Sequence, residues 1–126
     1  MNIFWFRRDL RLGDNRALYE LAQFEDCGAI YIHDVTLQSQ DDFSSLHRDF
    51  IDESLNDLSK KFIDCGGFLN IYEGESVEIF SRLISRFNIH RVYNNSEIGS
   101  KPIRDRDLAL EKLFKSQRVE WLVYQN

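Results

Sequence analysis

A cluster of arginines follows the aromatic start of the chain. The stretch FWFRRDLRLGDNRAL contains four arginines and two aspartates: Arg7, Arg8, Asp9, Arg11, Asp14 and Arg16. This excess of guanidinium groups could hold an anionic cofactor or the anionic surface of a partner through charge-assisted hydrogen bonds. The same residues also suit an Arg/Asp network that pins the loop. Residue type and spacing therefore leave anion binding and loop stabilisation open as alternatives.

Other common chemistries lack their motifs. The six glycines make neither GxGxxG nor a phosphate-binding P-loop, and no GxSxG segment marks a nucleophilic serine. The histidines have no metal-ligand spacing and lie in three different predicted elements: His33, His47 and His90. Cys27 and Cys65 form no CxxC pair. No metal site is therefore expected.

The composition favours one globular domain over residues 1–126. Ten Phe, five Tyr and two Trp, with 43% hydrophobic residues and one Pro, provide enough apolar surface for a core. A net charge of −5 argues against a surface that wraps nucleic acid. No apolar run reaches the roughly 18 residues of a membrane helix, and Arg7 interrupts the N-terminus too early for a signal peptide. The cytoplasm is therefore the expected location.

Strands and helices alternate along the chain. Short runs rich in aromatic or β-branched residues predict five strands: Asn2 to Phe6, Ala29 to His33, Phe68 to Tyr72, Arg91 to Asn94 and Val119 to Tyr124. Longer stretches with helical spacing predict four helices: Asp14 to before Gly28, about Phe43 to Cys65, Val77 to Phe87 with Ser76 as N-cap, and from Pro102 to about Ser116. This alternation predicts an α/β fold.

Strands that alternate with helices imply right-handed crossovers. The expected architecture is a Rossmann-like, five-stranded parallel sheet with helices on both faces and strand order 3-2-1-4-5. Ligands of such folds bind at the carboxyl edge, where the strand order reverses between strands one and four. The loops at that place are Arg7 to Gly13 and Asn95 to Lys101, with His33 to Gln38 at the rim. Functional residues are expected in these three segments.

Several of these segments resemble one family. The stretch from Phe4 to Leu18 is similar to the N-terminal signature of DNA photolyases and cryptochromes, an aromatic strand followed by RRDLRL-DN-AL. Arg48 to Leu58 resembles that family's long second helix, and Gly67 to Gly74 its third strand with the following glycine. Val92 to Asn94 and Arg104 to Asp107 resemble the end of its fourth strand and the RD element of the next helix. The resemblance covers nearly the whole chain.

The resemblance implies a role in light harvesting. In that family the N-terminal α/β domain can hold an antenna chromophore, a folate, a deazaflavin or FMN, which passes excitation to FAD. A larger helical domain binds FAD and the pyrimidine dimer, and we expect it to lie outside these residues. FAD and DNA would then be bound only through that domain, in cis or in trans. The parent activity would be that of a blue-light-driven deoxyribodipyrimidine photo-lyase, and no repair is expected from these 126 residues alone.

An antenna site needs an apolar slot for a flat ring, a few polar groups and cations for an acidic tail. The resemblance, placed on the crevice loops, assigns this site to seven residues: Arg8, Arg11, Asp34, Val35, Arg48, Asn95 and Glu97. The segment after the fourth strand departs from the family's N-x-[DE]-x-E-P-Y pattern. From Asn94 to Pro102 it has Glu97 as its one carboxylate and no aromatic residue. An empty crevice is the alternative to a bound chromophore.

Two functions of other classes remain open. One is a stand-alone nucleotide-binding module of the same fold, although such modules usually carry the glycine-rich loop that this sequence lacks. The other is a protein-interaction module in which the loop from Arg7 to Arg16 docks a helical partner. An exposed apolar patch near that loop would favour the second alternative.

Overall fold

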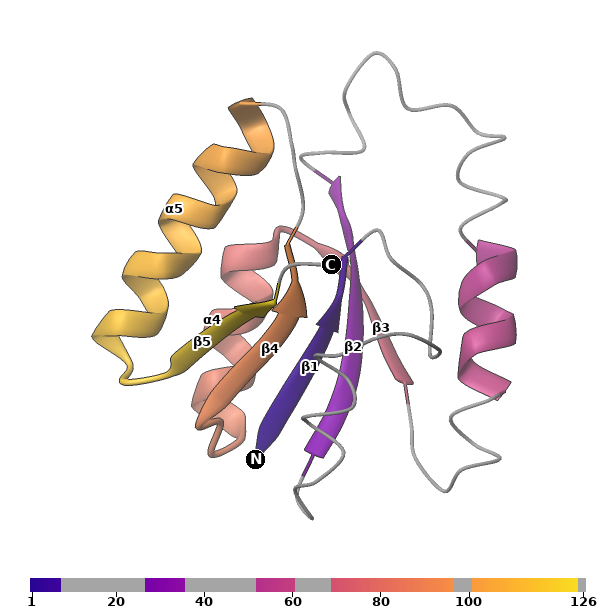
Figure 1. The fold of residues 1–126 in the computed structure, drawn as a ribbon, viewed down its shortest axis with the longest axis horizontal. Coiled ribbons are helices and arrows are strands. Elements are labelled where there is room, and N and C mark those ends of the chain that lie inside the picture. Colours follow the sequence, from indigo (N-terminus) through magenta and orange to yellow (C-terminus); the bar gives the residue numbers. More distant parts are fainter. Residues whose placement is uncertain (8–26, 36–51, 61–68, 97–100, 125–126) are drawn as a thin grey trace.

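The computed structural model describes residues 1–7, 27–35, 52–60, 69–96 and 101–124 (Figure 1). Its labelled elements, in chain order, are β1 (Asn2–Phe6), β2 (Cys27–Asp34), β3 (Leu69–Gly74), α4 (Ser76–Arg86), β4 (Arg91–Asn95), α5 (Lys101–Ser116) and β5 (Glu120–Tyr124). Residues 52–60 form a further helix, called helix 52–60 below. The predicted first helix, and both ends of the predicted second helix, lie outside the described residues.

The strands form one parallel sheet in the order β3-β2-β1-β4-β5. Phe4 of β1 lies beside Ala29 of β2 on one side and Tyr93 of β4 on the other. This arrangement confirms the predicted fold class and strand order. The limits of β1 are as predicted, and the limits of the other strands differ from the predicted ones by at most two residues, which is usual for strand limits inferred from side-chain patterns.

The central strand β1 is buried along its whole length, and its side chains divide the core in two. Ile3 and Trp5 pack in one cluster with residues of α4 and α5, whereas Phe4 and Phe6 pack in another with Leu55 and other residues. Successive side chains of a strand point to opposite faces of the sheet. The sheet therefore has an α4/α5 face and a helix 52–60 face, and Figure 1 shows these helices on its two sides.

A chain of aromatic rings fills the α4/α5 face. Trp5 meets Phe80 of α4 edge-on at a centroid distance of 5.1 Å, and Phe80 meets Phe114 of α5 at 5.3 Å. Phe114 then meets Trp121 of β5 at 5.3 Å. Such edge-to-face pairs add to the stabilisation from buried area. The rings thus connect the central strand to both helices and to the edge strand.

The start of α4 differs from the prediction that Ser76 is its N-cap. Glu75 occupies the N-cap position in an extended conformation and makes no side-chain capping bond, and Ser76 is the first residue of the helix. Ser76 lies inside the helix and not at its cap, and its hydroxyl donates a hydrogen bond to Asp34 of β2. The start of α5 fits the prediction more closely, since Pro102 lies in its first turn, where no intrahelical donor is lost.

Candidate functional site

The carboxyl edge of the sheet carries the described part of the predicted site. Strands β1 and β4 are neighbours there, so the strand order reverses between them, and β2 lies on the other side of β1. Asp34 ends β2, Val35 follows it, and Asn95 ends β4. Four further predicted site residues lie outside the described residues: Arg8, Arg11, Arg48 and Glu97.

Asp34 links strand β2 to helix α4. Its side chain is buried, and Oδ2 accepts hydrogen bonds from the backbone N–H of Ser76 at 3.2 Å and from the Ser76 hydroxyl at 2.5 Å. The first N–H groups of a helix have no partner within the helix, and the N-terminal end attracts negative charge. Asp34 therefore provides a partner for the first N–H group of α4 and joins the carboxyl edge of the sheet to that helix.

Asp34 and Asn95 belong to opposite faces of the sheet. Ile32 lies in the α4/α5 cluster, so Asp34, two residues later, points to the same face. Val92 also lies in that cluster, and Asn95, three residues later, points to the helix 52–60 face. The two residues were predicted to hold one ligand together. They lie at the same edge of the sheet, and their side chains leave it on opposite faces.

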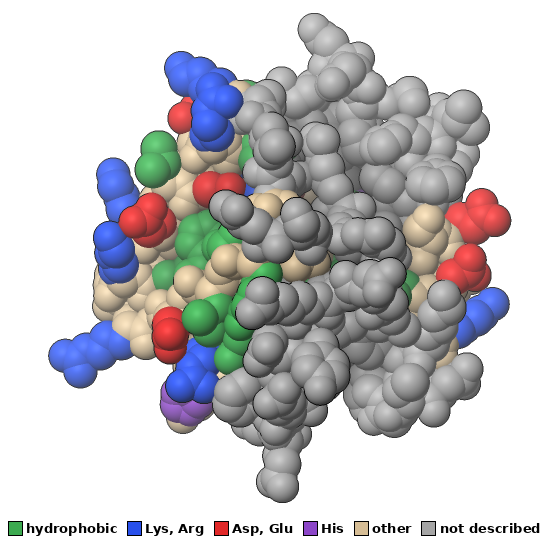
Figure 2. All heavy atoms as spheres, viewed as in Figure 1, with side chains coloured by type: hydrophobic (Ala, Val, Ile, Leu, Met, Phe, Trp, Pro, Cys, Tyr) green, Lys and Arg blue, Asp and Glu red, His purple; other side chains and the backbone are tan. Residues whose placement is uncertain are grey.

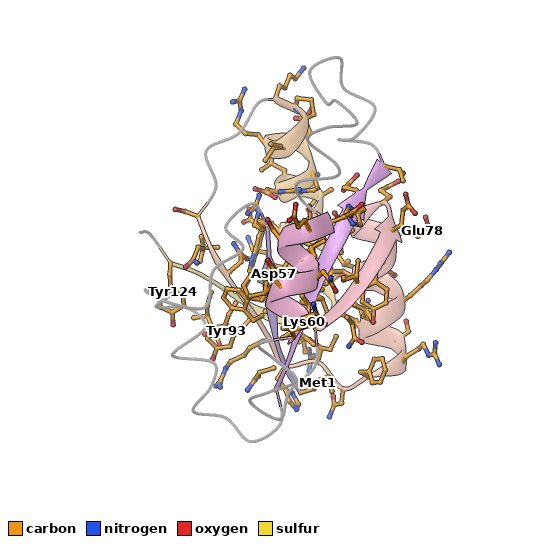
Figure 3. All side chains as sticks on the ribbon, turned by 90° about the vertical axis from the view of Figure 1, so that its right-hand side faces the viewer. Met1, Asp57, Lys60, Glu78, Tyr93 and Tyr124 are labelled. Carbon is orange, nitrogen blue, oxygen red and sulfur yellow. The ribbon has the colours of Figure 1, made fainter. Side chains whose placement is uncertain are left out.

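Two stacked tyrosines lie on the face to which Asn95 belongs. The rings of Tyr93 and Tyr124 are nearly parallel, with an interplanar angle of 11° and centroids 6.3 Å apart. Figure 3 shows both side chains on the same side of the sheet. The backbone N–H of Ser96 donates to the carbonyl of Tyr124 at 2.6 Å, which joins the ends of β4 and β5. A parallel aromatic pair therefore lies next to the amide of Asn95.

His33 is a polar residue on this face that the sequence analysis placed in the rim segment but not among the seven site residues. Its side chain lies on the same face of β2 as those of Ala29 and Tyr31, because alternate residues of a strand share a face, and it is buried. Its Nε2 lies 3.3 Å from a carboxylate oxygen of Asp52, and its ring meets Tyr31 edge-on at 4.9 Å. The signal in the sequence was the alternation itself, which puts a histidine at the last inward position of the strand. His33 connects the rim of the carboxyl edge to helix 52–60.

Arginines and one carboxylate form a network on the α4/α5 face. Arg7, whose side chain is 5% exposed, pairs with Asp107 of α5 at 2.8 Å, and Arg106 pairs with the same carboxylate at 3.1 Å. The guanidinium carbons of both arginines lie about 5 Å from the centroid of the Trp5 ring, a cation–π geometry. The Arg/Asp network that was one alternative for the arginine cluster is therefore present at Arg7. The carboxylate described in this network comes from α5.

Asn94 also holds the α4/α5 face together. It is fully buried, accepts a hydrogen bond from the indole N–H of Trp121 and donates to the backbone carbonyl of Asn95 at 2.9 Å. The amino end of the sheet is different in character. There the Arg91 guanidinium donates a hydrogen bond to the Glu120 carboxylate at 3.1 Å, which raises the pKa of Arg91.

Two further findings concern only the residues that the structure describes. Among them, no group of three His, Cys, Asp or Glu side chains could hold a metal ion. None of the described helices is long and apolar enough to cross a membrane.

Comparisons with known proteins agree with this fold. The family model for DNA photolyase matches residues 2–126. Cryptochrome-1 of Anopheles gambiae is 33% identical over 129 residues, which cover 94% of this chain and 23% of that protein. Cryptochrome-1 of Sylvia borin is 31% identical, covering 96% of this chain and 20% of that protein. This chain thus spans about a fifth of the length of these relatives.

Solved structures show the same architecture. The photolyase of Sulfolobus tokodaii, described with two FAD molecules and the implication of a novel light-harvesting cofactor, matches with a TM-score of 0.86 and 28% identity. The match covers 99% of this chain and 29% of that one. The class III photolyase of Agrobacterium tumefaciens matches with a TM-score of 0.85 and 26% identity, over 98% of this chain and 25% of that one.

The fold and its carboxyl edge define a Rossmann-like α/β domain whose strand order reverses between β1 and β4. The chain belongs to the DNA photolyase family and has the fold of the N-terminal α/β domain of photolyases and cryptochromes. The family resemblance of the sequence is therefore confirmed.

Proposed function

We propose that this chain binds or scaffolds a light-harvesting antenna chromophore at the carboxyl edge of its sheet. The observation that carries the proposal is the place where the strand order reverses, with Asn95 and the Tyr93–Tyr124 pair on one face beside it. Flat ligands bind in slots that are largely apolar and contain a few polar groups. The chromophore classes that fit are a folate, a deazaflavin or a flavin such as FMN.

The residues of the proposed site have separate tasks. The amide of Asn95 can exchange hydrogen bonds with the edge of a heteroaromatic ring, and Val35, 46% exposed, supplies apolar surface at the rim. Arg8, Arg11 and Arg48 would provide cations for a phosphate or carboxylate tail, and Glu97 a carboxylate for the ring. Asp34, through its bonds to Ser76, supports this edge from the opposite face.

Light harvesting requires no acid, base or nucleophile from this chain. The chromophore absorbs the light, and the residues have only to bind it, orient it and keep competing water away from its ring. This requirement agrees with a described edge that is rich in aromatic rings and amides.

The photochemical step belongs, in this proposal, to a helical FAD-binding domain supplied in cis or in trans. That domain would split pyrimidine dimers under blue light and make the contacts to DNA, in the cytoplasm. Two observations support this division. The curated relatives extend well beyond the matched fifth of their length, and the photolyase of Sulfolobus tokodaii is described with two FAD molecules.

The test is an absorption and fluorescence titration of the purified chain. Near-ultraviolet and blue spectra are recorded before and after addition of FMN, FAD, a reduced folate and a deazaflavin. We expect one of them to bind saturably, and Asn95→Ala to weaken it about tenfold, the equivalent of one to two hydrogen bonds. Asn88→Ala, an exposed asparagine before β4 at the amino end, is the matched control and leaves binding unchanged. Absence of saturable binding for all four ligands would refute the antenna role.

A further inference from the structure

The outward side of helix α5 carries a regular row of side chains. The helix buries Ile103, Leu110 and Phe114 against the sheet. Five exposed residues follow one another on the opposite side at steps of three or four: Lys101, Arg104, Leu108, Lys112 and Lys115. Residues at this spacing are neighbours on a helix surface. They form one row, called the α5 stripe below. It consists of four cations, two on either side of a central leucine.

The α5 stripe is basic, although the chain as a whole carries a charge of −5. Figure 2 shows Lys and Arg side chains along the left-hand side of the molecule, over α5. Lys115 forms an exposed pair with Glu111 at 3.0 Å, whereas Lys101 and Lys112 make no ion pair with any residue that the structure describes. The stripe is therefore a local region of positive charge on an acidic protein.

Leu108 makes the stripe different from an ordinary solvated helix face. Its side chain is 59% exposed, the highest value among the large hydrophobic residues that the structure describes as exposed. Binding surfaces commonly combine a central apolar anchor with a polar rim that sets orientation. The stripe has this arrangement along about 21 Å of helix, from Lys101 to Lys115, because each residue adds about 1.5 Å.

We propose that the α5 stripe is a docking surface for an acidic helical segment of a partner protein. An apolar side chain of the partner helix would cover Leu108, and carboxylates one turn to either side would meet Arg104 and Lys112. Lys101 and Lys115 would extend the charge pairing at both ends. Complementary charges of this kind speed encounter and fix orientation. The proposal does not depend on the antenna function, because the stripe points away from the sheet.

Two features favour an acidic protein segment over nucleic acid. Exposed carboxylates border the stripe on both sides, Asp105 on one and Glu111 on the other. These carboxylates would repel the continuous row of phosphates of a nucleic acid. A partner helix can avoid the repulsion, because its carboxylates need to lie only opposite the cations. Leu108 gains nothing from contact with phosphate, but it buries apolar area against a side chain.

The experiment uses the full chain and a dye-labelled probe peptide, followed by fluorescence anisotropy at low salt. The probe is an amidated helical peptide with one leucine at its centre and glutamates three and four residues to either side. We expect saturable binding that weakens as salt increases, because exposed charge pairs are screened. Lys112→Glu should weaken binding about tenfold, and Leu108→Ala about threefold. Lys60→Glu makes the same charge change on helix 52–60 and should leave binding unchanged.

The substituted residues are exposed, so thermal melting curves of the three variants should stay close to that of the unmodified chain. Equal weakening by Lys112→Glu and Lys60→Glu would overturn the proposal, because the effect would then be one of net charge alone. The proposal would also be overturned if a duplex DNA of similar length bound the chain more tightly than the peptide does, and if Lys112→Glu abolished that binding. A probe without its leucine that binds as well as the original would also overturn it.

Discussion

The two faces of the sheet are built differently at the carboxyl edge. On the α4/α5 face, polar groups are paired with one another: Asp34 with Ser76, Asn94 with Trp121, and Arg7 with Asp107. On the helix 52–60 face, the same edge has stacked tyrosines, the amide of Asn95 and the buried His33. The charged groups that the structure describes at this edge thus serve mainly to join strands to helices.

This difference separates two parts of the domain. The α4/α5 face, with its paired polar groups and its chain of aromatic rings, is called the frame below, and the proposed site lies at the edge of the other face. A buried charge or amide is costly unless it has partners, and the α4/α5 face supplies these partners from distant parts of the chain. The ends of β1, β2 and β4 are thereby held in register with α4 and α5. The other face has fewer of these described long-range polar pairs, His33 with Asp52 being one, and its edge consists mainly of aromatic and amide groups.

The largest effect is expected inside the frame. Phe80→Ala removes a fully buried ring that contacts both Trp5 and Phe114, and should lower the free energy of unfolding by about 4 kcal/mol. Urea denaturation measures this value. Phe87→Ala is the matched control, because this ring at the end of α4 is 44% exposed, and it should cost about 1 kcal/mol or less. Similar losses for both variants would show that the aromatic chain does not hold the face together.

Much of this frame is predictable from the sequence. The alternation of strands with helices predicted the parallel sheet and its order, because parallel strands need crossovers of one hand. Phe80 and Phe114 recur at helical spacing with other apolar residues of the predicted helices, and both rings lie in the core. These inferences succeed because they depend on local periodicity, which a single sequence displays directly.

The pairing of polar groups was not predictable in the same way. Arg7 and Asp107 are 100 positions apart, and Asp34 and Ser76 are 42 positions apart. Nothing in local spacing identifies such partners. Ser76 was therefore predicted to be an N-cap, and its bonds to Asp34 were not foreseen. The strand alternation, applied to the ends of β2 and β4, would have separated Asp34 from Asn95, because it is a local signal.

A second, smaller effect is expected at the arginine network. Asp107→Asn removes the charge that two nearly buried guanidinium groups share, and should lower the free energy of unfolding by about 2 kcal/mol. The emission of Trp5, which lies beside both groups, should shift as well. In the control Glu111→Gln, an exposed helix pair with Lys115 is lost, and the cost should be about 0.3 kcal/mol. Equal costs for the two variants would contradict a structural role for the network.

The smallest effect is expected on the helix 52–60 face. Tyr124→Leu removes one ring of the stacked pair on the edge strand and should cost about 1 kcal/mol, whereas Tyr124→Phe keeps the ring and should cost less. If the two faces are energetically separate, the loss in the double variant with Asp107→Asn should equal the sum of the single losses to within about 0.5 kcal/mol. Urea denaturation of the four proteins measures this. A larger coupling would mean that the arginine network and the tyrosine pair stabilise each other through the sheet, and that the frame and the proposed site are one unit.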